Sequence, residues 1–175
     1  PLLADRCEMS DDSLTFTFHM NPLAMWSDGK PVTAEDVRWT VEAVMDPKHL
    51  TGPHKIGLER FEPPEVINES TIRFVAKKEH WQNLNVLAGL QVLPKHAFDG
   101  KDFNLQNFGF PVVSGPYRLG PIKEGMQVTL ERRPDWWAGE LPRFPKASNF
   151  DTLVFRFFES RDNALEAFKK GETYL

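Results

Sequence analysis

Residues 26–40 read Trp-Ser-Asp-Gly-Lys-Pro-Val-Thr-Ala-Glu-Asp-Val-Arg-Trp-Thr and join a tight turn to the start of a helix. The Asp28-Gly29 pair is typical of a tight turn, and the proline that follows excludes a central strand. Thr33 can accept a hydrogen bond from the first helical turn while Asp36 reaches back to it, which is a capping-box pattern. Apolar residues then recur at spacings of three and four until Asp46-Pro47, so one helix face is apolar.

The flanking sequence predicts a sheet beside this helix. Residues 14–20 alternate between apolar and polar side chains, which is typical of a strand with one buried face. Residues 71–76 predict a second strand that pairs with a neighbour. Residues 47–64 show little periodicity and predict a long loop. Residues 81–90 predict a helix with Leu84, Leu87 and Ala88 on one face, and residues 93–98 predict a turn into a short helix. We expect core positions at Phe16, Phe18, Val37 and Val41.

The second half predicts another sheet. Residues 99–113 are loop-like, and we place a lobe boundary there. Strands are expected from Gly115 and over residues 128–132, joined by a hairpin turn at 123–125, and over residues 153–158. Ser160 can cap a final helix that Gly171 ends. We expect a core made by Phe155, Phe157, Ala164, Leu165 and Phe168. The order of elements predicts a mixed α/β (α+β) fold.

Composition limits the classes of function. The net charge is −4 and the pI about 5.8, so no basic excess is present to neutralise phosphates, which excludes nucleic acid as a partner. Lysine and arginine pairs such as Arg132-Arg133 are interpreted as solvated faces. The single cysteine, Cys7, cannot form an internal disulfide. No apolar run reaches the roughly 18 residues that span a bilayer.

Motifs for catalysis and cofactor binding are absent from the sequence. It contains no Gly-x-Ser-x-Gly elbow, no Walker loop, no Gly-x-Gly-x-x-Gly and no His-Glu-x-x-His. His49, His54 and Glu59 could contact one metal ion, but this spacing is a weak signal. Asp135 beside Trp136-Trp137 fits either a sugar platform or aromatic packing at a strand end. We therefore expect no enzyme activity, no cofactor and no metal site.

Three blocks, in order along the chain, carry a resemblance to one family. They are residues 26–40, then Ser114-Gly115-Pro116-Tyr117 with residues 131–137, then residues 150–155 with the helix from Arg161 to Gly171-Glu172. The chain resembles the extracellular solute-binding proteins of family 5, which serve peptide and nickel importers. Residues 149–168 look closest to the Yej-type oligopeptide-binding branch. Trp136 departs from the family pattern, in which tyrosine is commoner.

The resemblance implies both a fold and a function. It implies an incomplete clamshell cut from a longer protein, with a small α/β lobe (residues 1–108) and part of the first main lobe of a class II periplasmic-binding-protein-like fold (residues 109–175). It implies the substrate-binding component of a bacterial ABC importer that captures oligopeptides and delivers them to the permease. The alternative is another solute, a nickel complex or a sugar. We expect a periplasmic or lipid-anchored extracellular monomer that is peripheral to the membrane and contacts the permease subunits.

Ligand-binding residues are expected on loops near the lobe boundary. Gln91, Ser114 and Tyr117 are the candidates, and a role in a turn or in core packing is open for each. If the ligand is a sugar, Trp81, Trp136 and Trp137 are candidate stacking faces.

Overall fold

The first sheet has four antiparallel strands in the order β1-β2-β4-β3. The strands are β1 (Ala4–Met9), β2 (Thr15–Met20), β3 (Glu65–Asn68) and β4 (Thr71–Val75). Our computed structural model describes residues 2–101, 112–139, 141 and 148–174. Phe16 pairs with Phe74 and Phe18 with Ile72, so the period-two pattern places these four side chains in the core. The predicted strands at residues 14–20 and 71–76 are confirmed.

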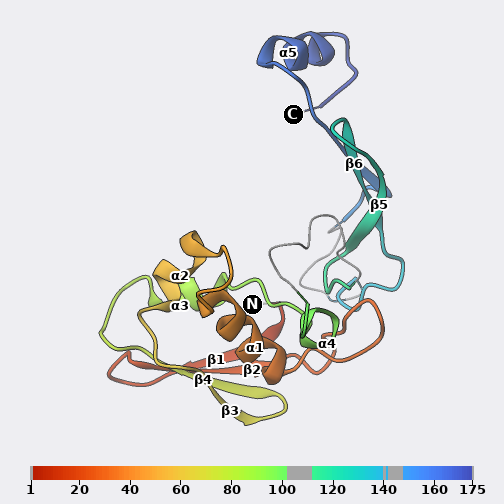
Figure 1. The fold of residues 1–175 in the computed structure, drawn as a ribbon. Coiled ribbons are helices and arrows are strands. Elements are labelled where there is room, and N and C mark those ends of the chain that lie inside the picture. Colours follow the sequence, from red (N-terminus) through yellow and green to blue (C-terminus); the bar gives the residue numbers. More distant parts are fainter. Residues whose placement is uncertain (1, 102–111, 140, 142–147, 175) are drawn as a thin grey trace.

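Helix α1 (Ala34–Met45) packs its apolar face on this sheet, and Figure 1 shows α1, α2 and α3 on one side of it. Thr33 is the N-cap, and the capping box with Asp36 is present. The helix ends at Asp46, as predicted. The core predicted around Phe16 and Phe18 is confirmed, and it is closed by side chains from the sheet and helices: Met20, Val37, Val41, Val44, Leu58, Phe61, Ile72, Phe74 and Leu87.

Three short helices complete the first part of the chain: α2 (Gly52–Leu58), α3 (Asn83–Ala88) and α4 (Lys95–Phe98). The loop predicted over residues 47–64 is wrong in its middle, where α2 forms. Pro53 is compatible with this helix because it stands in the first turn, where its missing N–H is not needed. The helix predicted over residues 81–90 is confirmed in a shorter form. Of its predicted apolar face, Leu87 is buried in the core, but Leu84 and Ala88 are exposed. Val86, and not Leu84, is the residue of α3 that lies against Gly57 of α2.

The second sheet is formed by β5 (Tyr117–Lys123), β6 (Gln127–Arg132) and β7 (Thr152–Arg156), all antiparallel. Helix α5 (Arg161–Lys169) follows, and Figure 1 shows it at the far end of the β5–β6 hairpin from the first sheet. The predicted strands and hairpin are confirmed, with Gly125 at φ +69° in the turn. The predicted cap is also confirmed, since Ser160 Oγ accepts from the Asn163 N–H at 3.1 Å.

The predicted core of this second part is wrong. Phe155 and Phe157 are 52% and 58% exposed, and Leu165 and Phe168 are also exposed. The physical reason is that β7, which pairs with β6 along one edge, is the last strand of its sheet, and that α5, at the described end of the chain, does not close over it. Phe155, Leu165 and Phe168 therefore line an open groove between β7 and α5 instead of a closed core.

Two further predictions concern the lobe boundary and membrane-spanning segments. The predicted lobe boundary at residue 108 falls outside the described residues. Among the residues that the structure does describe, no helix combines the length and the apolarity needed to cross a membrane.

Candidate functional site

The candidate site is the segment Val112–Tyr117, which runs between the two sheets and contains two of the three predicted ligand-binding residues. On one side it is held by the tight turn predicted at residues 26–30. The Ser27 N–H donates to the Val113 carbonyl at 2.8 Å, and the Val113 N–H donates to Ser27 Oγ at 3.1 Å. This reciprocal pair fixes the direction of the segment at its start.

On its other side the segment is held by Arg133, whose side chain is only 4% exposed. The guanidinium donates to the carbonyls of Val113 at 3.2 Å and Gly115 at 3.0 Å. It also donates to Asp135 Oδ2 at 3.4 Å, and this hydrogen bond lowers the pKa of the Asp135 carboxyl. The interpretation of Arg132-Arg133 as a solvated pair is therefore wrong for Arg133. A buried arginine cannot be told from an exposed one by charge pattern alone.

Ser114 contributes to the site through its main chain. Its carbonyl accepts from the indole N–H groups of Trp136 and Trp137, both at 3.0 Å. Trp137 also packs against the core of the first sheet, so the pair supports the aromatic-packing interpretation of residues 136–137. The Ser114 hydroxyl makes no hydrogen bond to any other residue in the described part of the chain.

Tyr117 begins β5 and fastens the site to the second sheet. Its hydroxyl donates to the Phe150 carbonyl at 2.9 Å, which connects the start of β5 to the segment before β7. The oxygen of a phenol can still accept a hydrogen bond after donating its proton, so Tyr117 retains one polar function for a ligand.

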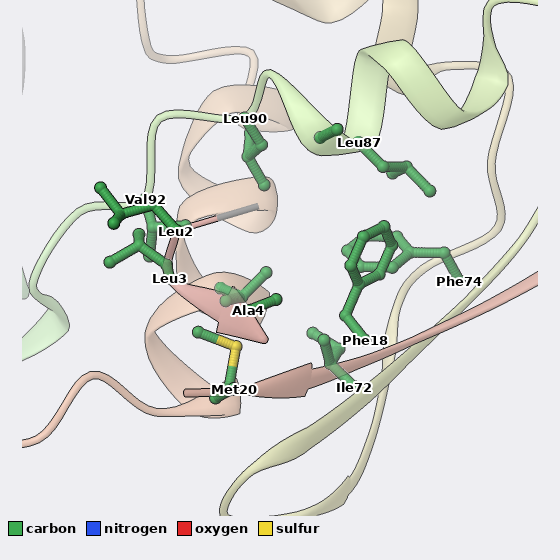
Figure 2. A pocket seen from close by; sticks show the side chains of 12 residues that line it. Leu2, Leu3, Ala4, Phe18, Met20, Ile72, Phe74, Leu87, Leu90 and Val92 are labelled. Carbon is green, nitrogen blue, oxygen red and sulfur yellow. The ribbon is translucent and has the colours of Figure 1, made fainter. Parts of the chain in front are cut away.

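Gln91 lies elsewhere, in the connection between α3 and α4, with an exposed side chain. Among the described residues, no hydrogen bond or ion pair joins Gln91 to Ser114 or Tyr117. Its neighbours Leu90 and Val92 line an apolar pocket of about 230 Å³ whose other wall includes Phe18 and Phe74 of the sheet, as Figure 2 shows. No polar side chain lines this pocket, so its side chains can receive an apolar group but cannot orient a peptide main chain.

The turn at residues 26–30 is itself supported by Asp36. This buried carboxylate, 5% exposed, accepts four hydrogen bonds. Oδ2 accepts from the Thr33 N–H at 2.9 Å, the Thr33 hydroxyl at 3.1 Å and the Trp26 indole at 3.2 Å. Oδ1 accepts from the Lys95 N–H at 2.9 Å. The residue predicted only as part of a cap thus joins the turn, α1 and α4.

A second contact joins the turn to α4. His96 Nε2 donates to Asp28 Oδ2 at 2.7 Å. Partial burial acts to raise the pKa of the Asp28 carboxyl, but the hydrogen bonds from His96 and the Lys30 N–H outweigh it and lower that pKa. The turn therefore contacts α1 through Trp26, the candidate segment through Ser27 and α4 through Asp28.

Glu35 gives the α1–α4 contact a predicted dependence on pH. Hydrogen bonds from Arg38 at 2.8 Å and Lys95 at 2.8 Å lower the pKa of its carboxyl to about 2, from an ordinary 4.5. A depressed folded-state pKa stabilises the fold above the unfolded pKa, and this stability is lost as the pH falls from about 4.5 to about 2. The side chain is 38% exposed, so solvent screening keeps the effect below about 1 kcal/mol.

We therefore expect Glu35→Gln to lose less stability than the wild type between about pH 5 and about pH 3. Urea unfolding at both pH values measures this difference. Glu65→Gln, which removes an exposed partner of Arg73, is the control and should follow the wild type. Identical pH profiles for the wild type and Glu35→Gln would contradict the prediction.

His49, His54 and Glu59, which were considered as metal ligands, do not form a metal site among the described residues. The ring of His49 donates through Nδ1 to the Ala43 carbonyl at 2.7 Å. Among the described residues, which include His54 and Glu59, no group of three or more His, Cys, Asp or Glu side chains is placed to hold a metal ion.

Comparison with known sequences gives matches over nearly the whole chain. The sequence model described as "Bacterial extracellular solute-binding proteins, family 5 Middle" matches residues 1–175. The Peptidoglycan-binding protein YepA of Agrobacterium fabrum is 33% identical over 98% of this chain and 28% of its own length. A protein of the same organism named "Probable peptide-binding protein YejA" is 31% identical over 97% of this chain and 28% of its own. The chain thus spans about 28% of the curated relatives that it matches.

Solved structures of transporter binding proteins share the fold of this chain. The ABC transporter substrate-binding protein CtaP of Listeria monocytogenes matches with a TM-score of 0.80 and 30% identity, over 98% of this chain and 35% of its own. A periplasmic oligopeptide-binding protein of Thermotoga maritima, solved with bound mannohexaose, matches with a TM-score of 0.79 and 25% identity, over 98% of this chain and 32% of its own.

Proposed function

Because the chain belongs to the bacterial extracellular solute-binding proteins of family 5, we propose that it is part of the substrate-binding component of a bacterial ABC importer. In this proposal the whole protein captures oligopeptides and delivers them to the membrane permease. The observation that carries the proposal is the family match over residues 1–175. The same match confirms the resemblance carried by the three sequence blocks.

The geometry of Val112–Tyr117 supports a role in ligand binding. Ser27 holds the segment from one side, and Arg133 and the two indoles hold it from the other. A segment that is already ordered loses little entropy when a ligand binds, which favours affinity. We assign Ser114 and Tyr117 to contact with the ligand through their hydroxyl oxygens. Gln91 is assigned a contact from the α3–α4 connection through its exposed amide.

The proposed partners and location follow from the family. The peptide is bound between two lobes, and the closed form contacts the permease subunits. We propose a periplasmic or lipid-anchored extracellular monomer that is peripheral to the membrane. The extracellular character of the family supports a location outside the cytoplasm.

A sugar is the second candidate ligand. It is supported by the mannohexaose in the Thermotoga protein, which matches this chain with a TM-score of 0.79, and by the name of the peptidoglycan-binding relative. A nickel complex is the other alternative that the sequence leaves open.

Native mass spectrometry tests these alternatives. This chain is purified gently and mixed in separate experiments with a random oligopeptide pool, an oligosaccharide pool and a nickel–histidine complex. Retained peptides of varied sequence are the expected result. If the chain stays bare, the full-length gene product is tested in the same way. A full-length product that stays bare with peptides but retains a sugar or nickel complex would overturn the peptide proposal.

A further inference from the structure

Strand β7 exposes apolar side chains on both of its faces. Val154 and Phe155 are neighbours in the strand, so their side chains point to opposite faces of the second sheet, and they are 51% and 52% exposed. A strand with one solvated face alternates apolar and polar residues, whereas the unbroken apolar run of residues 153–155 is typical of a strand covered on both faces. The sequence of β7 therefore fits a more complete cover than the described residues provide.

One edge of β7 is also free. The strand pairs with β6 and is the last one in the order β5-β6-β7. On the paired side, the Phe157 N–H donates to the Met126 carbonyl at 2.8 Å. Because the main-chain groups of successive residues point alternately to the two edges, those of Thr152, Val154 and Arg156 point away from β6. No other strand of the described residues pairs with this edge, and an apolar strand with an open edge is prone to aggregation unless something covers it.

The groove beside this edge has apolar walls. Phe155 lies on the β7 wall, and Leu165 and Phe168 lie on the α5 wall. The two α5 side chains are three positions apart, hence on one face of the helix, and are 50% and 44% exposed. Arg156 forms an ion pair of 3.4 Å with Glu172, which connects the end of β7 to the residues after α5. A β-strand fits this surface better than a helix does, because a helix would leave the main-chain groups of β7 unpaired.

We propose that the free edge of β7 and the groove toward α5 form an intramolecular interface, which is occupied by a β-strand from outside residues 1–175 of the full-length protein. The strand pairs with the main chain of β7, and its apolar side chains pack on Phe155, Leu165 and Phe168. The length of the relatives favours this occupant over a second copy of the chain. The chain covers 28% of YepA and 35% of CtaP, so most of each protein lies outside the matched part. The inference rests on the family match and not on the identity of the ligand.

Hydrogen–deuterium exchange resolved to single amides tests this interface by comparing the present chain with the full-length gene product. The Val154 amide, which points to the free edge, should exchange at least about tenfold more slowly in the full-length product than in this chain. The Phe155 amide points to β6 and is bonded in both proteins, so it is the internal control and should be protected equally.

Truncation of Phe155 gives a second measurement. Phe155→Ala should lower the unfolding temperature of this chain by less than about 2 °C, because the side chain is half exposed, but that of the full-length product by about 4 °C or more. Ile56→Ala is the matched control, since Ile56 is an apolar residue of α2 that is 67% exposed, and it should have the same small effect in both proteins. If full-length Phe155→Ala does not fold, the Val154 amide of the wild type still decides.

Two results would overturn the interface. One is equal exchange of the Val154 amide in this chain and in the full-length product. The other is protection of that amide that rises with protein concentration, together with a dimer in analytical ultracentrifugation, which would assign the surface to a second copy. Neither measurement uses a ligand, so both results leave the peptide proposal unchanged.

Discussion

Replacing Asp36 with alanine is expected to lower the free energy of unfolding by about 3 to 5 kcal/mol. The carboxylate accepts four hydrogen bonds, and its removal leaves the Trp26 indole and the Lys95 N–H as buried donors without an acceptor. One of the four bonds is the Asp36 half of the capping box, whereas the other half, from the N–H of residue 36 to Thr33 Oγ1, does not depend on the side chain and remains. Urea unfolding followed by tryptophan fluorescence and by circular dichroism measures the change.

Two further variants test whether the loss of stability comes from the hydrogen bonds of Asp36. One removes its charge, and the other removes a different carboxylate of the same helix. Asp36→Asn keeps one acceptor oxygen but presents an amide N–H₂ group to the donors on the other side, so an intermediate loss of stability is expected. Glu42→Ala removes an exposed carboxylate from the same helix, whose ion pair with Arg38 is worth about 0.5 kcal/mol or less. If Asp36→Ala were no less stable than Glu42→Ala, the four hydrogen bonds would not have the proposed importance.

Asp36 also marks what the sequence can and cannot predict. Its bond to Thr33 follows from a spacing of three residues, so the cap and the start of α1 were predictable. Its bonds to Trp26 and Lys95 join residues 10 and 59 positions away, and no local pattern contains that information. The same limit explains why α2 was missed. Its seven residues include two glycines and a proline, and contact with α3 stabilises it.

The errors in the second part have a different cause. The alternation around Phe155 correctly predicts strand β7, but burial depends on what packs on that strand. Among the described residues, α5 shares an open groove with β7 but does not close over it, and Phe155 remains 52% exposed. In the candidate site, the sequence directed attention to Ser114 and Tyr117 because they lie beside the predicted lobe boundary. It could not show that the Ser114 carbonyl accepts hydrogen bonds from two indoles, because every residue has a main-chain carbonyl and a side-chain pattern does not indicate which one is bonded.

Replacing Arg133 with methionine is expected to lower the free energy of unfolding by about 2 to 4 kcal/mol. Methionine retains much of the apolar stem, but the carbonyls of Val113 and Gly115 lose a charged donor. Arg132→Met is the matched control. Arg132 is the adjacent residue, its side chain is 46% exposed, and its partner Asp151 is 82% exposed. Removal of an exposed pair of this kind costs between about 0 and 1 kcal/mol.

The two arginine variants also separate stability from ligand binding. If Arg133 orders Val112–Tyr117 for a ligand, Arg133→Met should weaken peptide retention at temperatures where it remains folded, because the segment must then be ordered at the expense of binding. Arg133→Lys keeps the positive charge, but its shorter side chain does not extend to the position of Nη1, which donates to both carbonyls, so it should resemble Arg133→Met more than the wild type. Wild-type stability and hydrogen exchange at residues 113–117 in Arg133→Met would show that Ser27 and the indoles suffice to hold the segment. That result would remove Arg133 from the site.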